Sequence, residues 1–151
     1  MHHVVFSNPF SNSRSGEHDI LLNNSQWRLL QPRVELQSDH EDFVESTKGF
    51  FKETLSFGDA HEDNGQSLMN ILEALHSLKT AVLAAKDYPV SFDGMLFLRP
   101  DLLYHDTLDF ALVRRTMMNN AVTTPGWQLH MGYNDRFSYG AWDPMYAIGT
   151  R

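Results

Sequence analysis

The sequence contains no cysteine, so it can form no disulfide and can offer no thiolate to a metal ion. It also lacks an apolar run of the roughly 18 residues that a transmembrane helix needs. Its first residues show no basic stretch followed by a long apolar one, which is the pattern of a secretory signal. These absences predict a protein without a membrane span and make the cytoplasm its default location.

Positive charge is scarce, above all in the first half of the chain. Residues 1–75 carry 5 Lys and Arg against 12 Asp and Glu, whereas residues 76–151 carry 7 of each. The net charge of −7 therefore belongs to the first half. Binding to nucleic acids depends on clustered Lys and Arg that face the phosphates. The sequence thus argues against a nucleic-acid partner, while a small charged ligand held by a few residues remains compatible with it.

Several common functional motifs are also missing. The sequence has no GxxxxGK[ST], no GxGxxG and no GxSxG, which removes the commonest signatures of NTPases, dinucleotide-binding enzymes and α/β-hydrolases. Its eight histidines are scattered and form no HExxH pair. The sequence therefore offers no compact set of metal ligands.

The apolar pattern that is present predicts a single α/β domain. Residues 1–25 form a loop-rich segment in this interpretation, and residues 26–151 form the α/β domain. The clearest element is a helix over residues 66–86, whose apolar side chains recur every three or four positions. A short apolar run over residues 95–98 follows, bounded by Gly and Pro, and predicts a buried strand.

Weaker signals predict three more helices and three short strands. The helices are expected over residues 41–55 with Ser38 or Asp39 as N-cap, over 106–120 with Leu108, Leu112 and Met118 facing one way, and from Asp143 as N-cap onward. The strands are expected over residues 2–6, near 34–36 and over 121–125, and residues 128–140 are expected to be irregular.

A charged turn follows the predicted buried strand. It contains Arg99, Asp101, Tyr104, His105 and Asp106. In open α/β sheets, ligands bind beyond the carboxyl ends of the strands. Arg99 offers the forked donor that suits a diphosphate, and Asp101 offers a hard oxygen that suits a divalent metal. The residues alone fit a solvated turn with an incidental Arg–Asp pair equally well.

A second candidate site is the loop from Gly132 to Gly140. Asn134, Asp135 and Arg136 lie there among Tyr133, Phe137 and Tyr139. Aromatic walls around one carboxylate suit a general base, whereas an Asx-turn with packed aromatic residues is the structural alternative. His130, just ahead of this loop, is a candidate further metal ligand.

Four blocks of the sequence resemble a known family. "LMNILEALHSLKTA", "FDGMLFLRPDLLYHD", "TPGW" and "GYNDRFSYG…YAIGTR" occur in the order found in a group of glycosyltransferase-like proteins of the GT-A type. The resemblance covers residues 66–151, and more faintly 26–45. It implies a Rossmann-like GT-A three-layer α/β sandwich, incomplete at its N- and C-terminal ends, as in a truncated member.

The resemblance also implies an activity: transfer of a sugar from a nucleotide-sugar donor to the hydroxyl of a glycan or another acceptor. The family's D-x-D triplet, which holds Mn²⁺ or Mg²⁺ against the donor diphosphate, corresponds here to Arg99-Pro100-Asp101. Asp101 would therefore meet metal and diphosphate with Arg99 beside it, and an Arg in the first Asp position puts metal dependence in question. Asp135 would be the catalytic base. The acceptor or other substrate groups would be contacted by Trp127, Tyr133, Asn134 and Arg136.

Two other functions remain open. The first is a non-catalytic remnant or interaction module of the same fold, favoured because the first 25 residues contain no convincing nucleotide-binding strand–helix unit. The second is a metal-dependent hydrolase, against which the lack of a compact ligand set argues.

Overall fold

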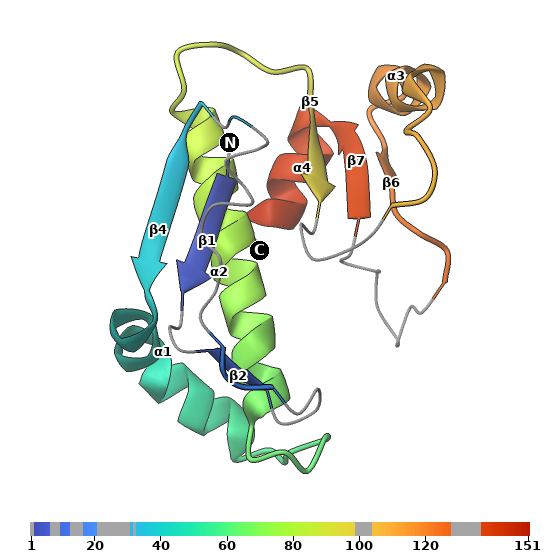
Figure 1. Cartoon of the computed structure of the whole chain (residues 1–151). Helices are drawn as coiled ribbons and strands as arrows, with labels where there is room; N and C mark the ends of the chain where they lie inside the picture. The colour runs from blue at the N-terminus through green and yellow to red at the C-terminus, as the bar shows by residue number, and fades with distance from the viewer. Residues whose placement is uncertain are drawn as a thin grey trace. The chain divides into compact units, whose positions relative to one another are not determined.

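The protein is a mixed α/β protein whose chain divides into two compact units, Met1–Ala85 and Lys86–Arg151 (Figure 1). The computed structural model describes residues 2–6, 10–12, 17–20, 31, 33–98, 104–127 and 137–151. Four helices lie among these residues. No helix in this part of the chain combines the length and the apolar character needed to cross a lipid bilayer.

Two pairs of strands belong to the first unit. β1 (His2–Phe6) pairs in parallel with β4 (Glu35–Asp39), and β2 (Phe10–Asn12) pairs antiparallel with β3 (Glu17–Ile20). The sequence predicts β1 and β4 correctly. It predicts loop where β2 and β3 lie, because these two strands are short, polar and without apolar alternation.

Aspartate side chains hold the first turns of both helices of the first unit. α1 (His40–Leu55) starts after Asp39, whose Oδ1 accepts hydrogen bonds from the backbone N–H groups of Glu41 (2.8 Å) and Asp42 (3.1 Å). Asp39 is one of the two caps that the sequence predicts. α2 (Gln66–Lys86) has the predicted bounds, and its first turn is held by Asp63, which accepts from the Ser67 hydroxyl at 2.6 Å.

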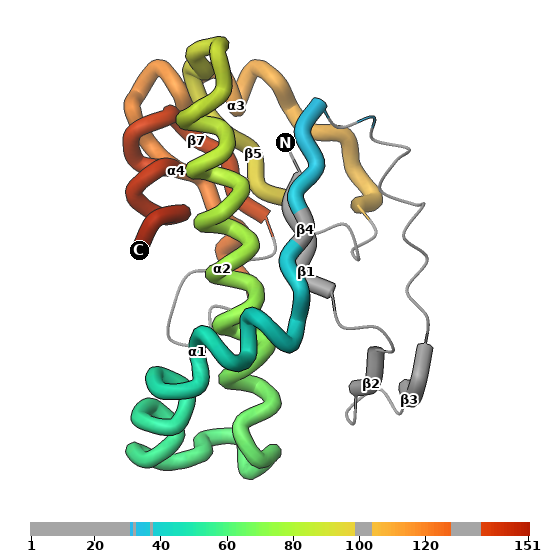
Figure 2. The backbone as a smooth tube through the Cα atoms, turned by 90° about the vertical axis from the view of Figure 1, so that its left-hand side faces the viewer, coloured from blue at the N-terminus to red at the C-terminus, as the bar shows by residue number. Residues whose placement is uncertain are grey.

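The start of α1 is fastened to the middle of α2, which runs alongside β4 (Figure 2). The Phe43 ring, almost fully buried, lies 4.9 Å from the His76 ring. The Nε2 atom of His76 is 3.3 Å from the Ser38 hydroxyl, and the Nδ1 atom of His40 is 2.8 Å from Oε1 of Glu73. The ring contact and the His40–Glu73 pair therefore fix α1 against α2, and the Ser38–His76 contact joins β4 to α2.

A three-stranded antiparallel sheet organises the second unit. Its order is β5 (Gly94–Leu98), β7 (Phe137–Ala141) and β6 (Val122–Thr123). α4 (Trp142–Gly149) packs against β5 and β7, and α3 (Phe110–Met118) is joined to β6 by a 3.1 Å hydrogen bond between the Thr116 and Thr123 hydroxyls. Tyr139, Ala141 and Met145 form the buried core between these elements.

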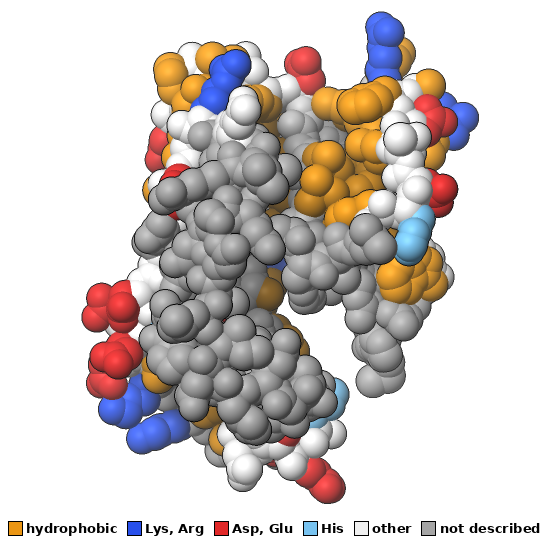
Figure 3. Space-filling model, viewed as in Figure 1, with side chains coloured by type: hydrophobic (Ala, Val, Ile, Leu, Met, Phe, Trp, Pro, Cys, Tyr) orange, Lys and Arg blue, Asp and Glu red, His pale blue; other side chains and the backbone are white. Residues whose placement is uncertain are grey.

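Several predictions for the second unit are wrong in detail. β5 is not buried on both faces, since Leu96 and Leu98 are 41% and 51% exposed, and Figure 3 shows hydrophobic side chains exposed over this unit. An apolar run cannot by itself distinguish a strand covered on two faces from one covered on a single face. β7 lies partly in the segment predicted to be irregular.

The two helices of this unit also differ from expectation. α3 buries Thr116 rather than Leu112 and Met118, and Met118 is 77% exposed. α4 begins earlier than predicted, with Ala141 as an N-cap that makes no side-chain hydrogen bond, so Asp143 lies in the first turn instead of capping it. The cause is the direct passage from β7 into α4, which leaves no room for a separate capping turn.

Candidate functional site

Two segments that carry most of the predicted site residues are attached to the same end of one sheet. Leu98, the last residue of β5, pairs with Phe137, the first residue of β7. Arg99 follows Leu98 directly, and Arg136 precedes Phe137 directly. Residues opposite each other in an antiparallel pair have Cα atoms about 5 Å apart. The two segments therefore connect to the sheet at neighbouring points.

Aromatic side chains mark this end of the sheet. The ring of Tyr104 lies 6.0 Å from that of Phe137, and Phe137 meets Tyr139 edge-on at 5.6 Å. Spacings in this range are typical of favourable aromatic pairs. Tyr104, six positions after Leu98 in the sequence, therefore lies at the end of the sheet where β7 begins.

Most of the predicted catalytic, metal-binding and substrate-binding side chains lie outside the described residues. These are Arg99, Asp101, His130, Tyr133, Asn134, Asp135 and Arg136. Their roles stay predictions. Trp127 is described: it follows β6 and is 55% exposed. His105 and Asp106 are described as well, and both are exposed.

One carboxylate of the second unit caps a helix. Asp109 caps α3, since its Oδ1 accepts hydrogen bonds from the backbone N–H groups of Ala111 (2.8 Å) and Leu112 (3.3 Å). The part of the chain that the structure describes contains no group of three His, Asp or Glu side chains that could hold a metal ion. The predicted ligands Asp101 and His130 are not among those residues.

The opposite end of β5 and β7 is held by stacked aromatic rings. The ring centroids of Tyr88 and Phe92, of Phe92 and Trp142, and of Trp142 and Tyr146 are each 6.0 Å apart. Lys86 completes the row, with its Nζ 5.5 Å from the centre of the Tyr146 ring. The backbone N–H of Trp142 also donates to the backbone carbonyl of Asp93 at 3.1 Å. These contacts fix the start of β5 to α4 and so support the pairing that aligns the other end.

The strand β7 is the part of this arrangement that sequence reasoning missed. Phe137, Tyr139 and Ala141 alternate with small residues, which is a period-two signal. This signal spans only five residues and directly follows the polar loop, so the whole segment 128–140 is predicted to be irregular. Recognising it would have predicted a strand able to pair with β5.

Comparisons with protein-family models, with curated proteins and with solved structures found no match. The function is therefore inferred from the residues of this chain and from their geometry. The paired ends of β5 and β7 are the feature that attaches the two predicted site segments to the sheet at neighbouring points.

Proposed function

We propose that the protein is a glycosyltransferase of the GT-A type, which transfers a sugar from a nucleotide-sugar donor to the hydroxyl of a glycan or another acceptor. One observation carries the proposal: Leu98 pairs with Phe137. Sugar transfer needs the group that binds the donor diphosphate and the group that activates the acceptor to face one reaction centre. The segments that hold these two candidate groups leave the sheet from paired residues.

The donor would be bound by the segment after β5. Asp101 would hold the diphosphate through Mn²⁺ or Mg²⁺, with His130 as a further protein ligand. Such a cation, when bound, supplies positive charge to the leaving diphosphate. Arg99 carries a permanent positive charge in the position where the family has its first Asp, and its forked donors match phosphate oxygens. We therefore expect activity without added metal to be reduced but not lost.

The acceptor would be activated by the segment before β7. Asp135 would take the proton of the acceptor hydroxyl as the acceptor oxygen bonds to the anomeric carbon of the donor sugar. The bond from that carbon to the diphosphate oxygen breaks in the same reaction, and the nucleotide leaves. Asn134 and Arg136 would contact substrate hydroxyl or phosphate groups. Trp127 and Tyr133 would wall the acceptor sugar, and the exposed indole of Trp127 suits the apolar face of a sugar ring.

The fold of the proposal is the Rossmann-like GT-A sandwich. The mixed α/β content and the parallel pairing of β1 with β4 are compatible with it. The resemblance of the four sequence blocks, three of which surround β5, β6 and β7, supports it further.

The test is nucleotide release from a panel of nucleotide-sugars with simple glycan acceptors, with Mn²⁺, with Mg²⁺ and with chelator. Asp135→Asn should lower turnover by about 10²- to 10⁴-fold while donor binding is retained. Asp143→Asn, the same change at an exposed position of α4, should leave turnover unchanged. Equal turnover of Asp135→Asn and the native chain would show that Asp135 is not the catalytic base.

A second function, an interaction module without catalysis, is favoured by one feature of the first unit. Among the described residues after β1, the next elements are the antiparallel strands β2 and β3, whereas a nucleotide-binding βα unit would continue into a helix. A ligand that binds only the native state raises the melting temperature. No rise with any nucleotide-sugar, with or without metal, would favour the interaction module.

A further inference from the structure

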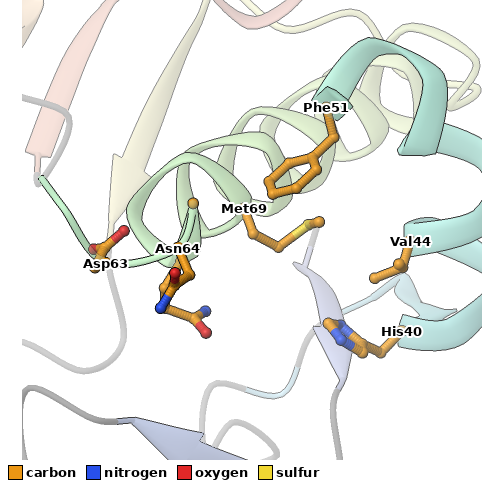
Figure 4. Close-up of a pocket in the computed structure, with 8 residues that line it drawn as sticks. His40, Val44, Phe51, Asp63, Asn64 and Met69 are labelled. Atoms are coloured by element: carbon orange, nitrogen blue, oxygen red, sulfur yellow. The ribbon is translucent and has the colours of Figure 1, made fainter. Parts of the chain in front are cut away.

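A hollow of about 400 Å³ lies in the first unit, between α1 and the turn that leads into α2 (Figure 4). Pockets for small molecules usually measure about 300–1,000 Å³. Figure 4 shows Val44 and Phe51 of α1 and Met69 of α2 pointing into a common space. The hollow is therefore large enough for a small organic molecule and offers it three apolar contacts.

The turn on one side of the hollow is held in place by its own side chains. Asp59 accepts hydrogen bonds from the backbone N–H groups of His61 (3.2 Å) and Gly65 (3.0 Å). Asp63 accepts from the backbone N–H of Ser67 at 3.1 Å as well as from its hydroxyl. Gly65 is buried and has a φ of 80°, a conformation that glycine adopts without strain. The side of the hollow formed by this turn is thus preformed.

The polar groups around the hollow include several hydrogen-bond acceptors. His40 lines the hollow, and its Nδ1 lies 2.8 Å from Oε1 of Glu73, an acidic residue of α2. Gln66 donates its amide N–H to the side-chain oxygen of Asn70 at 2.9 Å, so its carbonyl oxygen remains an acceptor. Asp63 contributes a carboxylate, and none of the described residues that line the hollow is a Lys or Arg.

The part of the chain that forms the hollow carries a negative net charge. Residues 1–75 contain the whole net charge of −7, and the turn itself carries Asp59, Glu62 and Asp63. A surface with one dominant sign of charge concentrates ligands of the opposite sign. Apolar contacts, acceptor-rich edges and a negative surrounding together match a molecule with a hydrophobic body and a cationic head.

We propose that this hollow binds a small amphipathic organic cation, namely an amine with an aromatic or branched aliphatic body. The body packs against Val44, Phe51 and Met69, and the ammonium group donates to side-chain oxygens of the turn that contains Asp63 and Asn64. This site lies in the first unit and does not depend on the proposed sugar transfer, which is assigned to residues of the second unit and the loops attached to it.

The first experiment is an NMR titration of the ¹⁵N-labelled full chain with three ligands of the same shape: 2-phenylethylamine, 2-phenylethanol and phenylacetate. The amine should shift the amide signals of His40, Val44, Phe51, Asn64 and Met69 in a saturable way. The alcohol should bind at least tenfold more weakly, and the carboxylate should cause no shift at the same concentration. Equal binding of amine and alcohol, or no binding of the amine, would overturn the proposal.

The second experiment places a positive charge at the hollow. Asn64→Lys should weaken binding of the amine tenfold or more, because like charges repel at short distance. His61→Lys adds the same charge to the same turn outside the lining and should change binding less than threefold. Both residues are exposed, and circular dichroism checks that each variant is folded. Equal losses in the two variants would assign the attraction to overall charge, and no loss in Asn64→Lys would place the ligand elsewhere; either result refutes the site.

Discussion

The pairing of Leu98 with Phe137 can be tested directly, because the chain has no cysteine of its own. We predict that the double variant Leu98→Cys/Phe137→Cys forms an intramolecular disulfide on mild oxidation. Residues directly opposite each other in antiparallel strands have Cβ atoms about 4.5–5.5 Å apart, and a disulfide needs about 3.5–4.5 Å. A small adjustment of the two strand ends therefore suffices.

The expected gain in stability follows from the length of the closed loop. A bond between residues 98 and 137 closes a loop of about 40 residues, for which the chain-entropy relation gives about 4 kcal/mol at 25 °C. Strain in the native strands reduces this value, so we take it as an upper limit. Urea unfolding gives the free energy of unfolding of the oxidised and reduced forms of the same variant. Because both forms carry the two substitutions, the difference reports the disulfide alone.

The matched control is Leu98→Cys/Ser138→Cys. Ser138 is the neighbour of Phe137 in the strand and pairs with Phe97, so its side chain lies on the other face of the sheet. This control should stay reduced under the same conditions, as followed by thiol titration and mass spectrometry. A register slip of one residue would exchange the two outcomes. A disulfide in the Ser138 variant, or none in either, would refute the pairing and remove the main support for the proposed function.

Three further predictions concern the packing that holds this sheet, and urea unfolding monitored by circular dichroism checks each of them. Gly140→Ala should destabilise the protein by about 1–3 kcal/mol, because the added methyl group would collide with the backbone of Ala121 and Val122, whereas Gly126→Ala, with open space around it, should change stability by less than about 0.5 kcal/mol. Met145→Ala should cost about 2–5 kcal/mol, because this side chain is fully buried between α4 and the sheet; a loss below about 1 kcal/mol would show that the site is not close-packed. Asp109→Ala should cost about 1 kcal/mol through loss of the α3 cap, and Asp109→Ser, which can still cap, should retain most of that stability.

The helices were the most predictable elements, because their signals are local. α2 follows from its apolar spacing, and α1 follows from a capping residue placed just before an amphipathic stretch. The Asp39 cap is satisfied entirely within three residues, by Glu41 and Asp42. Such hydrogen bonds depend on neighbours in sequence, which a reader of the sequence can see.

The residue that α3 buries and the covering of β5 do not follow from apolar spacing, because both depend on distant partners. Thr116 is buried and its hydroxyl is hydrogen-bonded to that of Thr123 in β6, and nothing in the sequence of the helix indicates that partner. Leu96 and Leu98 are apolar, yet whether a second layer covers them is decided by other parts of the chain. Periodicity reports which residues are apolar, whereas burial reports where the neighbouring elements pack.

For the candidate site, the sequence indicates which residues carry the chemistry, and the structure indicates where their segments attach to the sheet. The sequence nominates Asp101 and Asp135 by chemistry and resemblance, but 34 positions separate them and no local pattern brings them together. The pairing of β5 with β7 places the attachment points of their two segments opposite each other and says nothing of their chemistry. The register and the catalytic role can therefore fail separately. A chain that forms the Leu98–Phe137 disulfide but binds no nucleotide-sugar would keep this fold and act as an interaction module. A chain whose Asp135→Asn variant loses turnover but retains the donor would support the catalytic role of Asp135, whereas the register is tested independently by the Leu98–Phe137 disulfide.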